Sequence, residues 1–164
     1  MIFVTVGTHE QPFNRLVEYI DRWAGEHDEE VVIQLGYTRI EPKNCKWQQF
    51  YSHDEMMDLI RRARIVVTHG GPCCYMEVLR MGNIPVVVPR KSSLGEHIDD
   101  HQIKICREYI KHYNNLLLVE DIEKLGVCLS SYDDLTRNMD AKDLMSNNLE
   151  FCEKMSGLIG RLFQ

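Results

Sequence analysis

A glycine turn that opens a helix is the part of this sequence best suited to bind an anion. The turn His69-Gly70-Gly71-Pro72 follows an apolar run, and Pro72 takes a first helical position, where its missing N–H group costs nothing. First-turn N–H groups have no partners within a helix, and the helix dipole is positive at this end. Cys73 follows, but a thiol is a weak donor, so backbone amides would supply most of the binding. The pattern predicts a phosphate site, with a simple connecting turn as the alternative.

Glu77 and the triplet Asp100-His101-Gln102 have the chemistry needed to bind hydroxyl groups. Glu77 lies one and a half turns into the same helix, and its carboxylate can accept two hydrogen bonds from a diol. Gln102 carries an amide that both donates and accepts. The alternatives are a solvated helix glutamate and a helix start in which Asp100 lies near the positive dipole end.

The loop after the first apolar run, Gly7-Thr8-His9, combines backbone freedom with polar side chains. Gly7 would let a ligand approach the backbone, and Thr8 supplies a hydroxyl, although a plain tight turn is the alternative. His9 and Pro12 occupy the positions of the remaining glycines of the dinucleotide fingerprint, which is therefore absent. Arg90 and Lys91 could add positive charge beside an anion, or could belong to a solvated loop.

Apolar runs alternate with helical periodicities along the chain, which indicates a parallel α/β sheet with helices on both faces. Strands are expected at Ile2–Val6, Val31–Leu35, Trp47–Phe50, Ile65–Thr68, Ile84–Val88 and Leu116–Val119. Helices are expected from Pro12, from a capping box at Ser52 and Glu55, and over Cys73–Met81, Asp99–Tyr113 and Ile122–Leu129. Ligands of such sheets bind at the carboxyl ends of strands, so the loops 7–12, 51–53, 69–72 and 89–102 should share one edge.

The last segment of the chain carries an apolar stripe of helical spacing. The stripe consists of Leu144, Phe151, Met155, Leu158, Ile159 and Leu162. Two interpretations remain open, since such a helix can pack back on its own sheet or dock on another subunit.

Bulk composition is that of an ordinary globular protein of 164 residues, with 44% hydrophobic and 27% charged residues. The net charge of −6 argues against nucleic acid as a partner. Six cysteines without CxxC spacing or a signal peptide indicate reduced thiols in a cytosolic protein, and no apolar run is long enough to span a membrane. No Asp-x-Asp or ATPase phosphate loop occurs and the histidines are scattered, so neither a metal nor another cofactor is predicted.

Taken together, these motifs resemble the nucleotide-sugar half of family 28 glycosyltransferases over roughly residues 1–130. The opening Val4–Glu10 with Phe13–Leu16 resembles the small catalytic subunits of two-part transferases that build bacterial capsule and exopolysaccharide. The eukaryotic enzyme that adds N-acetylglucosamine to dolichol-linked sugar is a more distant relative. The resemblance implies half of a two-Rossmann-domain (GT-B) fold. Residues 1–132 would bind the nucleotide sugar, and residues 133–164 would form a helical extension of the same domain.

The resemblance also implies a role for each motif. The Gly7–Thr8 loop would lie under the diphosphate of a UDP-sugar, and His9 beside it could meet the diphosphate or act as a general base. The segment from His69 to Cys73 would hold the diphosphate, and Glu77 the ribose. Asp100, His101 and Gln102 would contact the donor sugar, while Tyr51 would line the uracil slot. Aligned amides would stabilise the charge on the leaving UDP without a metal.

The expected activity is inverting transfer of galactose, glucose, glucuronic acid or N-acetylglucosamine from a UDP-sugar to a lipid-diphosphate-linked sugar in capsule or exopolysaccharide synthesis. A membrane-anchored partner subunit would bind this acceptor and bring a cytoplasmic catalytic chain to the inner membrane face. Two alternatives remain, a non-catalytic UDP-sugar-binding regulatory module and a UDP-sugar 2-epimerase. The epimerase would normally require both domains in one chain.

Overall fold

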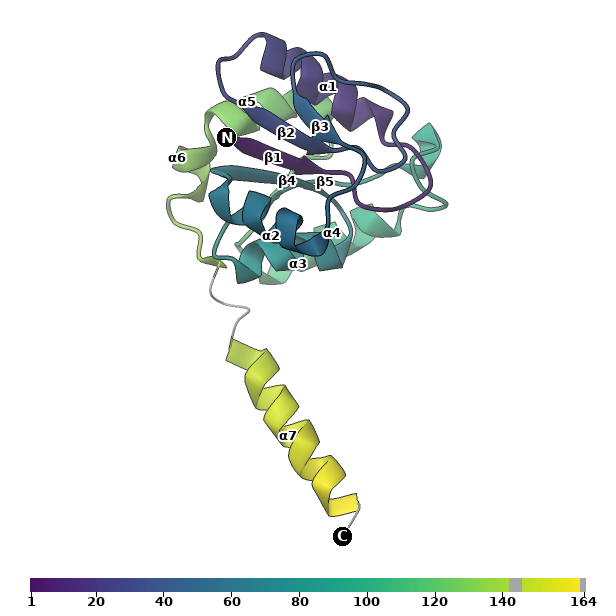
Figure 1. Ribbon diagram of the computed structural model, residues 1–164. Helices are drawn as coiled ribbons and strands as arrows, with labels where there is room; N and C mark the ends of the chain where they lie inside the picture. The colour runs from purple at the N-terminus through teal and green to yellow at the C-terminus, as the bar shows by residue number, and fades with distance from the viewer. Residues whose placement is uncertain (142–145, 163–164) are drawn as a thin grey trace.

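The computed structural model describes residues 1–141 and 146–162 and is built on one parallel six-stranded sheet (Figure 1). The sheet has the order β3-β2-β1-β4-β5-β6. Its strands are β1 (Ile2–Thr5), β2 (Val31–Gln34), β3 (Lys46–Gln48), β4 (Ile65–His69), β5 (Val86–Val88) and β6 (Leu117–Leu118). This order makes the chain change direction across the sheet between β1 and β4, the position where ligands of such sheets bind. The predicted fold class is therefore confirmed.

The central strands are buried on both faces, as their apolar runs predict. In β1, Ile2 and Val4 join the core cluster that includes Leu16 of α1 (Asn14–Gly25). Phe3 points the other way and packs in a second cluster with residues of α2 (His53–Arg62). Successive side chains of one strand thus pack in two hydrophobic clusters, one on each side of the sheet.

Helices cover both faces of the sheet (Figure 1). The helices α1 and α5 (Leu125–Ser130) lie over one face, while α2, α3 (Pro72–Arg80) and α4 (His101–His112) lie over the other. This distribution follows from right-handed crossovers between parallel strands. Short 3₁₀ turns at Ser92–Leu94 and Ile122–Lys124 precede α4 and α5.

Local signals fix two helix ends, and one of them is the predicted capping box. The Ser52 hydroxyl accepts a hydrogen bond from the Glu55 N–H (3.3 Å), and the Glu55 carboxylate accepts one from the Ser52 N–H (2.8 Å), which completes the capping box of α2. Gly82 follows α3 with a φ of +85°, the left-handed conformation that ends many helices.

The remaining differences from the predicted elements lie at their ends. β5 begins at Val86 rather than Ile84, since Pro85 has no N–H group to donate to a ladder. β3 begins one residue earlier than predicted and is exposed along its length. The predicted helix Ile122–Leu129 divides into a 3₁₀ turn and α5.

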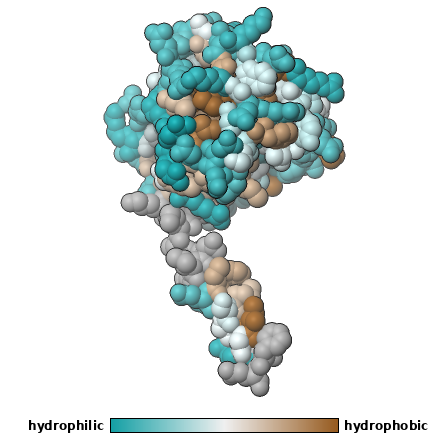
Figure 2. Space-filling view, viewed as in Figure 1, coloured by the Kyte–Doolittle hydropathy of each residue, from teal (hydrophilic) through white to brown (hydrophobic). Residues whose placement is uncertain are grey.

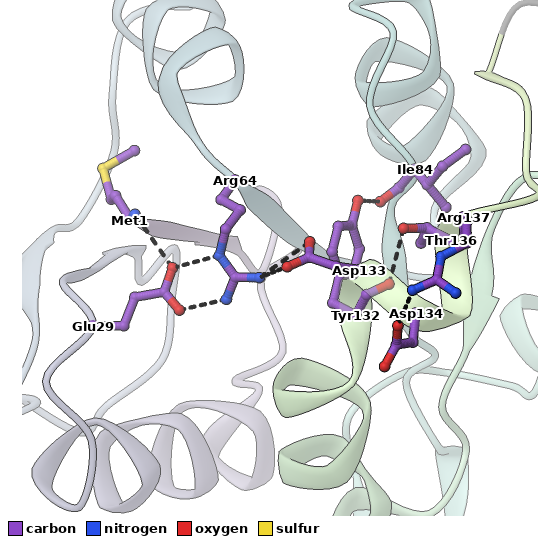
Figure 3. A network of polar contacts seen from close by, with 9 residues as sticks. All are labelled: Met1, Glu29, Arg64, Ile84, Tyr132, Asp133, Asp134, Thr136 and Arg137. Carbon is purple, nitrogen blue, oxygen red and sulfur yellow. Dashed lines mark hydrogen bonds and ion pairs between the residues drawn. The ribbon is translucent and has the colours of Figure 1, made fainter.

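A polar network at the amino-terminal ends of the strands anchors α6 (Tyr132–Thr136), as Figure 3 shows. Arg64, which precedes β4, donates from Nε to Glu29 (3.0 Å) and pairs through Nη1 with Asp133 of α6 (3.4 Å). The Tyr132 hydroxyl donates to the Ile84 carbonyl (2.6 Å). These contacts hold α6 against the amino-terminal ends of the strands, away from the predicted ligand edge.

The last helix, α7 (Ser146–Leu162), projects away from the sheet (Figure 1). Phe151, Met155, Leu158 and Ile159 are between 42% and 59% exposed, and Figure 2 shows apolar surface on this helix. The interpretation that the stripe packs on its own sheet is therefore wrong. Leu144 lies outside the described residues, as does the side chain of Leu162. No helix in the described part of the chain has both the length and the apolar composition to cross a bilayer.

Candidate functional site

A cavity of about 380 Å³ opens at the carboxyl ends of β1 and β4, where the direction of the chain changes. Seven of the residues that line it were predicted from the sequence, namely Gly7, Thr8, His9, His69, Gly71, Pro72 and Cys73. Four more were not, namely Thr5, Gln34, Met56 and Cys74. A polar residue within each of two otherwise apolar strand runs, Thr5 and Gln34, was the signal that could have found two of them.

A larger hollow, of about 600 Å³, lies beside β6. Its lining is mainly apolar and includes Leu117, Val127 and Leu135. Two of its three charged lining residues, Glu120 and Asp121, are acidic and would repel an anion, so we assign the ligand site to the cavity between β1 and β4.

The imidazole of His69 explains why two glycines border this cavity. A Cβ atom at Gly7 would lie 2.7 Å from His69 Nε2, and one at Gly71 would lie 2.6 Å from the same atom. Gly7 also has a φ of +77°, which disfavours any other residue. Both positions therefore require glycine because the His69 ring lies so close to the backbone. Close approach of a ligand would be a second reason.

His69 is 8% exposed, and its Nδ1 atom has no hydrogen-bond partner in the described part of the chain. Burial lowers the pKa of His69 to about 3, with a further contribution from the charge of Arg90. The ring is consequently neutral at physiological pH. It can give or accept a hydrogen bond in the cavity without carrying a charge.

The N-terminus of α3 faces the same cavity and leaves one amide of its first turn uncommitted. Gly71 is the N-cap residue, and no side chain among the described residues caps the helix. The Cys74 N–H donates to the Gly71 carbonyl (3.1 Å), which leaves the amide of Cys73 at the positive end of the helix dipole. This geometry fits the predicted phosphate position.

Arg90 lies inside the protein, so the alternative of a solvated loop residue is wrong, whereas its positive charge acts on His69 in the cavity. Its Nη1 atom donates to the carbonyls of Gln11 (2.8 Å) and Glu96 (2.9 Å), and its Nη2 atom donates to Val6 (2.8 Å). The guanidinium also stacks 4.7 Å from the ring centroid of Phe13. Burial lowers the pKa of Arg90 to about 10, so it stays charged at neutral pH. Arg90 thus joins the loops after β1 and β5, because its guanidinium N–H groups donate to backbone carbonyls of both loops.

The loop after β5 is further held by Glu96. Its carboxylate accepts two hydrogen bonds from Arg15 (2.8 and 2.9 Å) and one from the Lys91 N–H (2.9 Å). Lys91 itself is half-buried, and a phosphate contact by its ammonium group stays a prediction.

Gln102 also has a structural role that the sequence did not reveal. Its Oε1 atom accepts hydrogen bonds from the N–H groups of Gly70 (3.1 Å) and Arg90 (3.1 Å), and the residue is 3% exposed. The side chain therefore ties the end of β4 to the end of β5. Because the oxygen is committed, a contact with a sugar would have to come from its NH₂ group.

Asp100 and His101 lie at the start of α4. Asp100 Oδ1 accepts a hydrogen bond from the Ser92 N–H (2.8 Å), which lowers the pKa of the carboxyl group. His101 Nδ1 lies 2.5 Å from Asp99 Oδ1. His97, Asp99 and His101 form a compact cluster, so the histidines are less scattered than the sequence suggests.

His9 projects from the loop after β1 and packs against His97, with ring centroids 4.3 Å apart and the ring planes tilted by 46°. Its Nδ1 atom accepts a hydrogen bond from the Gln11 N–H (3.1 Å). In a neutral ring the proton then resides on Nε2, the tautomer that this hydrogen bond assigns. In this arrangement His9 can donate to an oxygen atom, whereas action as a base would require release of the Gln11 amide.

Glu77 and Tyr51 lie outside the cavity lining. Glu77 is half-buried one helical turn beyond Cys74, and its carboxylate makes no hydrogen bond or ion pair with the residues described. Tyr51 packs edge-on against Phe3, with ring centroids 6.3 Å apart, and lines a separate hollow along α2. Its N–H group donates to Gln34 Oε1 (3.4 Å), which connects this turn to the cavity wall.

The sheet order and the cavity at its crossover define one half of a GT-B glycosyltransferase fold. The chain belongs to the glycosyltransferase family 28 C-terminal domain family, whose model matches residues 1–151. It is 32% identical over 73 residues to the UDP-N-acetylglucosamine transferase subunit ALG13 of Yarrowia lipolytica. That match covers 44% of this chain and 35% of the relative.

The fold is also similar to the crystal structure of MurG from Acinetobacter baumannii, with a TM-score of 0.54 and 15% sequence identity. The similarity covers 81% of this chain and 41% of MurG. The chain thus matches less than half the length of either protein.

Proposed function

We propose that this chain is the donor-binding catalytic subunit of a split, inverting glycosyltransferase that uses a UDP-sugar. The observation that carries the proposal is the uncapped N-terminus of α3, which faces a glycine-lined cavity in a family 28 domain. The similarity to a fungal transferase subunit supports UDP as the nucleotide and a second subunit as the partner.

The diphosphate would bind along the turn from Gly70 to Cys73, chiefly at Gly71 and Cys73, because the Gly70 N–H group already donates to Gln102. Thr8 lines the same cavity. During transfer, negative charge grows on the departing UDP, and amides already aligned with a helix dipole stabilise it without reorganisation. The neutral ring of His69 would add an uncharged hydrogen bond at the same position.

The rest of the donor would extend outward from the diphosphate. Glu77, whose carboxylate has no competing partner among the described residues, would accept the two ribose hydroxyls. The turn at Tyr51 would hold the uracil. Asp100, His101 and the NH₂ group of Gln102 would contact the sugar from the start of α4.

His9 would meet the reacting groups. Its tautomer favours donation from Nε2 to a phosphate or acceptor oxygen. The general base would therefore be either His9, once its Nδ1 atom has released the Gln11 amide, or a residue of the partner subunit.

The acceptor would be a lipid-diphosphate-linked sugar of capsule or exopolysaccharide synthesis, bound by a membrane-anchored subunit. Residues 1–132 would hold the donor, and the extension 133–164 would present α7, whose exposed apolar stripe fits a docking role. The partner would bring this chain to the cytoplasmic face of the membrane.

The test is transfer from radiolabelled UDP-sugars (glucose, galactose, glucuronic acid and N-acetylglucosamine) to lipid-linked acceptor, with and without a co-expressed membrane subunit. The proposal predicts transfer only by the pair. UDP binding with no transfer by any reconstituted pair would instead support a regulatory module. Epimerised UDP-sugar would support the 2-epimerase.

A further inference from the structure

The turn before α4 gathers two imidazoles and a carboxylate beside the cavity. His97, Asp99 and His101 each offer one ligand atom, and these atoms lie within 4.8 Å of one another. Asp99 Oδ1 lies 3.7 Å from His97 Nδ1 and 2.5 Å from His101 Nδ1. The turn is compact because Asp99 Oδ1 also accepts a hydrogen bond from the His101 N–H (3.0 Å).

We propose that His97, Asp99 and His101 bind a divalent transition-metal ion of the Zn²⁺ class. Two imidazoles and one carboxylate are a set that zinc accepts in proteins, with a fourth position left for water or another ligand. Imidazole also suits Co²⁺ and Ni²⁺, whereas Mg²⁺ prefers oxygen ligands and keeps its water. The donor atoms therefore select for transition metals.

The distances allow all three ligands to reach one ion. Zinc bonds to nitrogen and oxygen ligands are about 2.0–2.2 Å long, so two ligands of one tetrahedral ion lie about 3.3–3.6 Å apart. The largest separation in the cluster is 4.8 Å. Rotations of side chains on a surface turn, which move the ligand atoms by roughly 1 Å or less, would close this difference.

The cluster combines one fixed ligand with two accessible ones. The His97 side chain is 11% exposed and lies against the ring of His9 at 4.3 Å. The side chains of His101 and Asp99 are 44% and 64% exposed, so an ion can enter from solvent. A bound ion would fix the turn from 97 to 101 at the start of α4. This role is additional to the proposed sugar contact, since His101 would bind the ion through Nδ1, the atom beside Asp99, and contact the sugar through Nε2. The charge on departing UDP is assigned to the α3 amides.

The experiment is titration of the purified, nucleotide-free chain with Zn²⁺ by calorimetry and with Co²⁺ by visible absorption. The wild type should bind one equivalent and show the absorption of Co²⁺ in a low-coordinate nitrogen and oxygen site. Asp99→Asn and His101→Ala should each weaken binding by roughly tenfold or more, since even outer-shell partners are typically worth 10–100-fold. Mg²⁺ in large excess should leave the Co²⁺ spectrum unchanged.

The matched control is His112→Ala, which removes another exposed histidine of α4 that lies 3.4 Å from a carboxylate, that of Glu108. It should bind Zn²⁺ like the wild type. The proposal is overturned if the wild type binds no more tightly than the Asp99→Asn/His101→Ala double variant, if His112→Ala loses as much affinity, or if Mg²⁺ displaces Co²⁺. Melting temperatures measured in EDTA show that each variant is folded.

Discussion

At the scale of single residues, the cavity is organised around the uncharged ring of His69. The ring is confined by Gly7 and Gly71, and burial holds its pKa at about 3. A histidine in an unfolded chain has a pKa of about 6.5, so between these values the unfolded state binds the additional proton. The free energy of unfolding must therefore decrease as the pH falls from about 6.5 toward 3, and the contribution is complete above pH 6.5.

Substitution His69→Gln should flatten this acid dependence. Each pH unit within the window is worth up to about 1.4 kcal/mol, so the wild type should lose several kcal/mol more than the variant between pH 6.5 and pH 4. Urea unfolding over this pH range measures the difference. His112→Gln, at an exposed position on α4, should keep the wild-type profile. Parallel wild-type and His69→Gln profiles would contradict a neutral buried ring.

Substitution Gly71→Ala should impair ligand binding more than folding. The new Cβ atom would lie 2.6 Å from His69 Nε2, so the ring must move into the space of the ligand. We expect UDP affinity to fall by about tenfold or more, equivalent to about 1.4 kcal/mol. Gly157→Ala is the control, since Gly157 of α7 has open space around its Cβ position and does not have a positive φ. Equal UDP affinities for Gly71→Ala and the wild type would show that the ligand does not bind beside this ring.

At the scale of elements, the loops after β1, β4 and β5 form one unit because two buried side chains join them. Arg90 donates to the carbonyls of Val6, Gln11 and Glu96, and Gln102 accepts from the N–H groups of Gly70 and Arg90. Both side chains occupy positions where the sequence suggested contact with a ligand. Their physical effect is to hold the cavity wall in place before the ligand arrives.

Substitution Arg90→Met should destabilise the fold and loosen this wall. It leaves buried carbonyls without donors, at about 1–3 kcal/mol each, so a loss of about 3 kcal/mol or more is expected in chemical denaturation. Arg80→Met is the control, because Arg80 is exposed at the end of α3. If Arg90 instead faced solvent, the two variants would have the same stability.

How much the sequence could predict follows from the range of the interactions involved. The strand and helix pattern, the capping box at Ser52 and the turn at Gly71 depend on neighbours in the chain, and they were predicted correctly. The sequence could not show that Arg90 and Gln102 are buried and hydrogen-bonded to the backbone, because their partners come from loops far away in sequence. Thr5 and Gln34 were missed for the same reason, since their position in the cavity depends on strand order.

At the scale of the whole molecule, one exposed helix extends from a closed α/β domain. The stripe of α7 leaves Phe151 at 59% and Leu158 at 52% exposure, an apolar surface that is costly in water. The chain also matches only 41% of the length of MurG and 35% of the fungal subunit. The partner subunit proposed above would cover the apolar surface of α7.

The double substitution Met155→Asp/Leu158→Asp should separate this chain from a co-expressed membrane subunit while leaving the domain folded. Both side chains are exposed, so the melting temperature should change by no more than a few degrees. Co-purification measures the association, and Ser156→Asp on the same helix is the control. A double variant that still co-purifies at wild-type yield would remove α7 from the interface.

Titration of the isolated chain with UDP, for the wild type and Glu77→Ala, tests the central claim most directly. UDP at a hundred times its dissociation constant should stabilise the wild type by about 2.7 kcal/mol. Glu77→Ala should lose most of that stabilisation with little change in its unliganded melting temperature, because its carboxylate has no partner among the described residues. Glu18→Ala, at an exposed position on α1, should respond like the wild type. Absence of any UDP effect on the wild type would contradict the donor-binding function, and an undiminished effect in Glu77→Ala would contradict the ribose assignment.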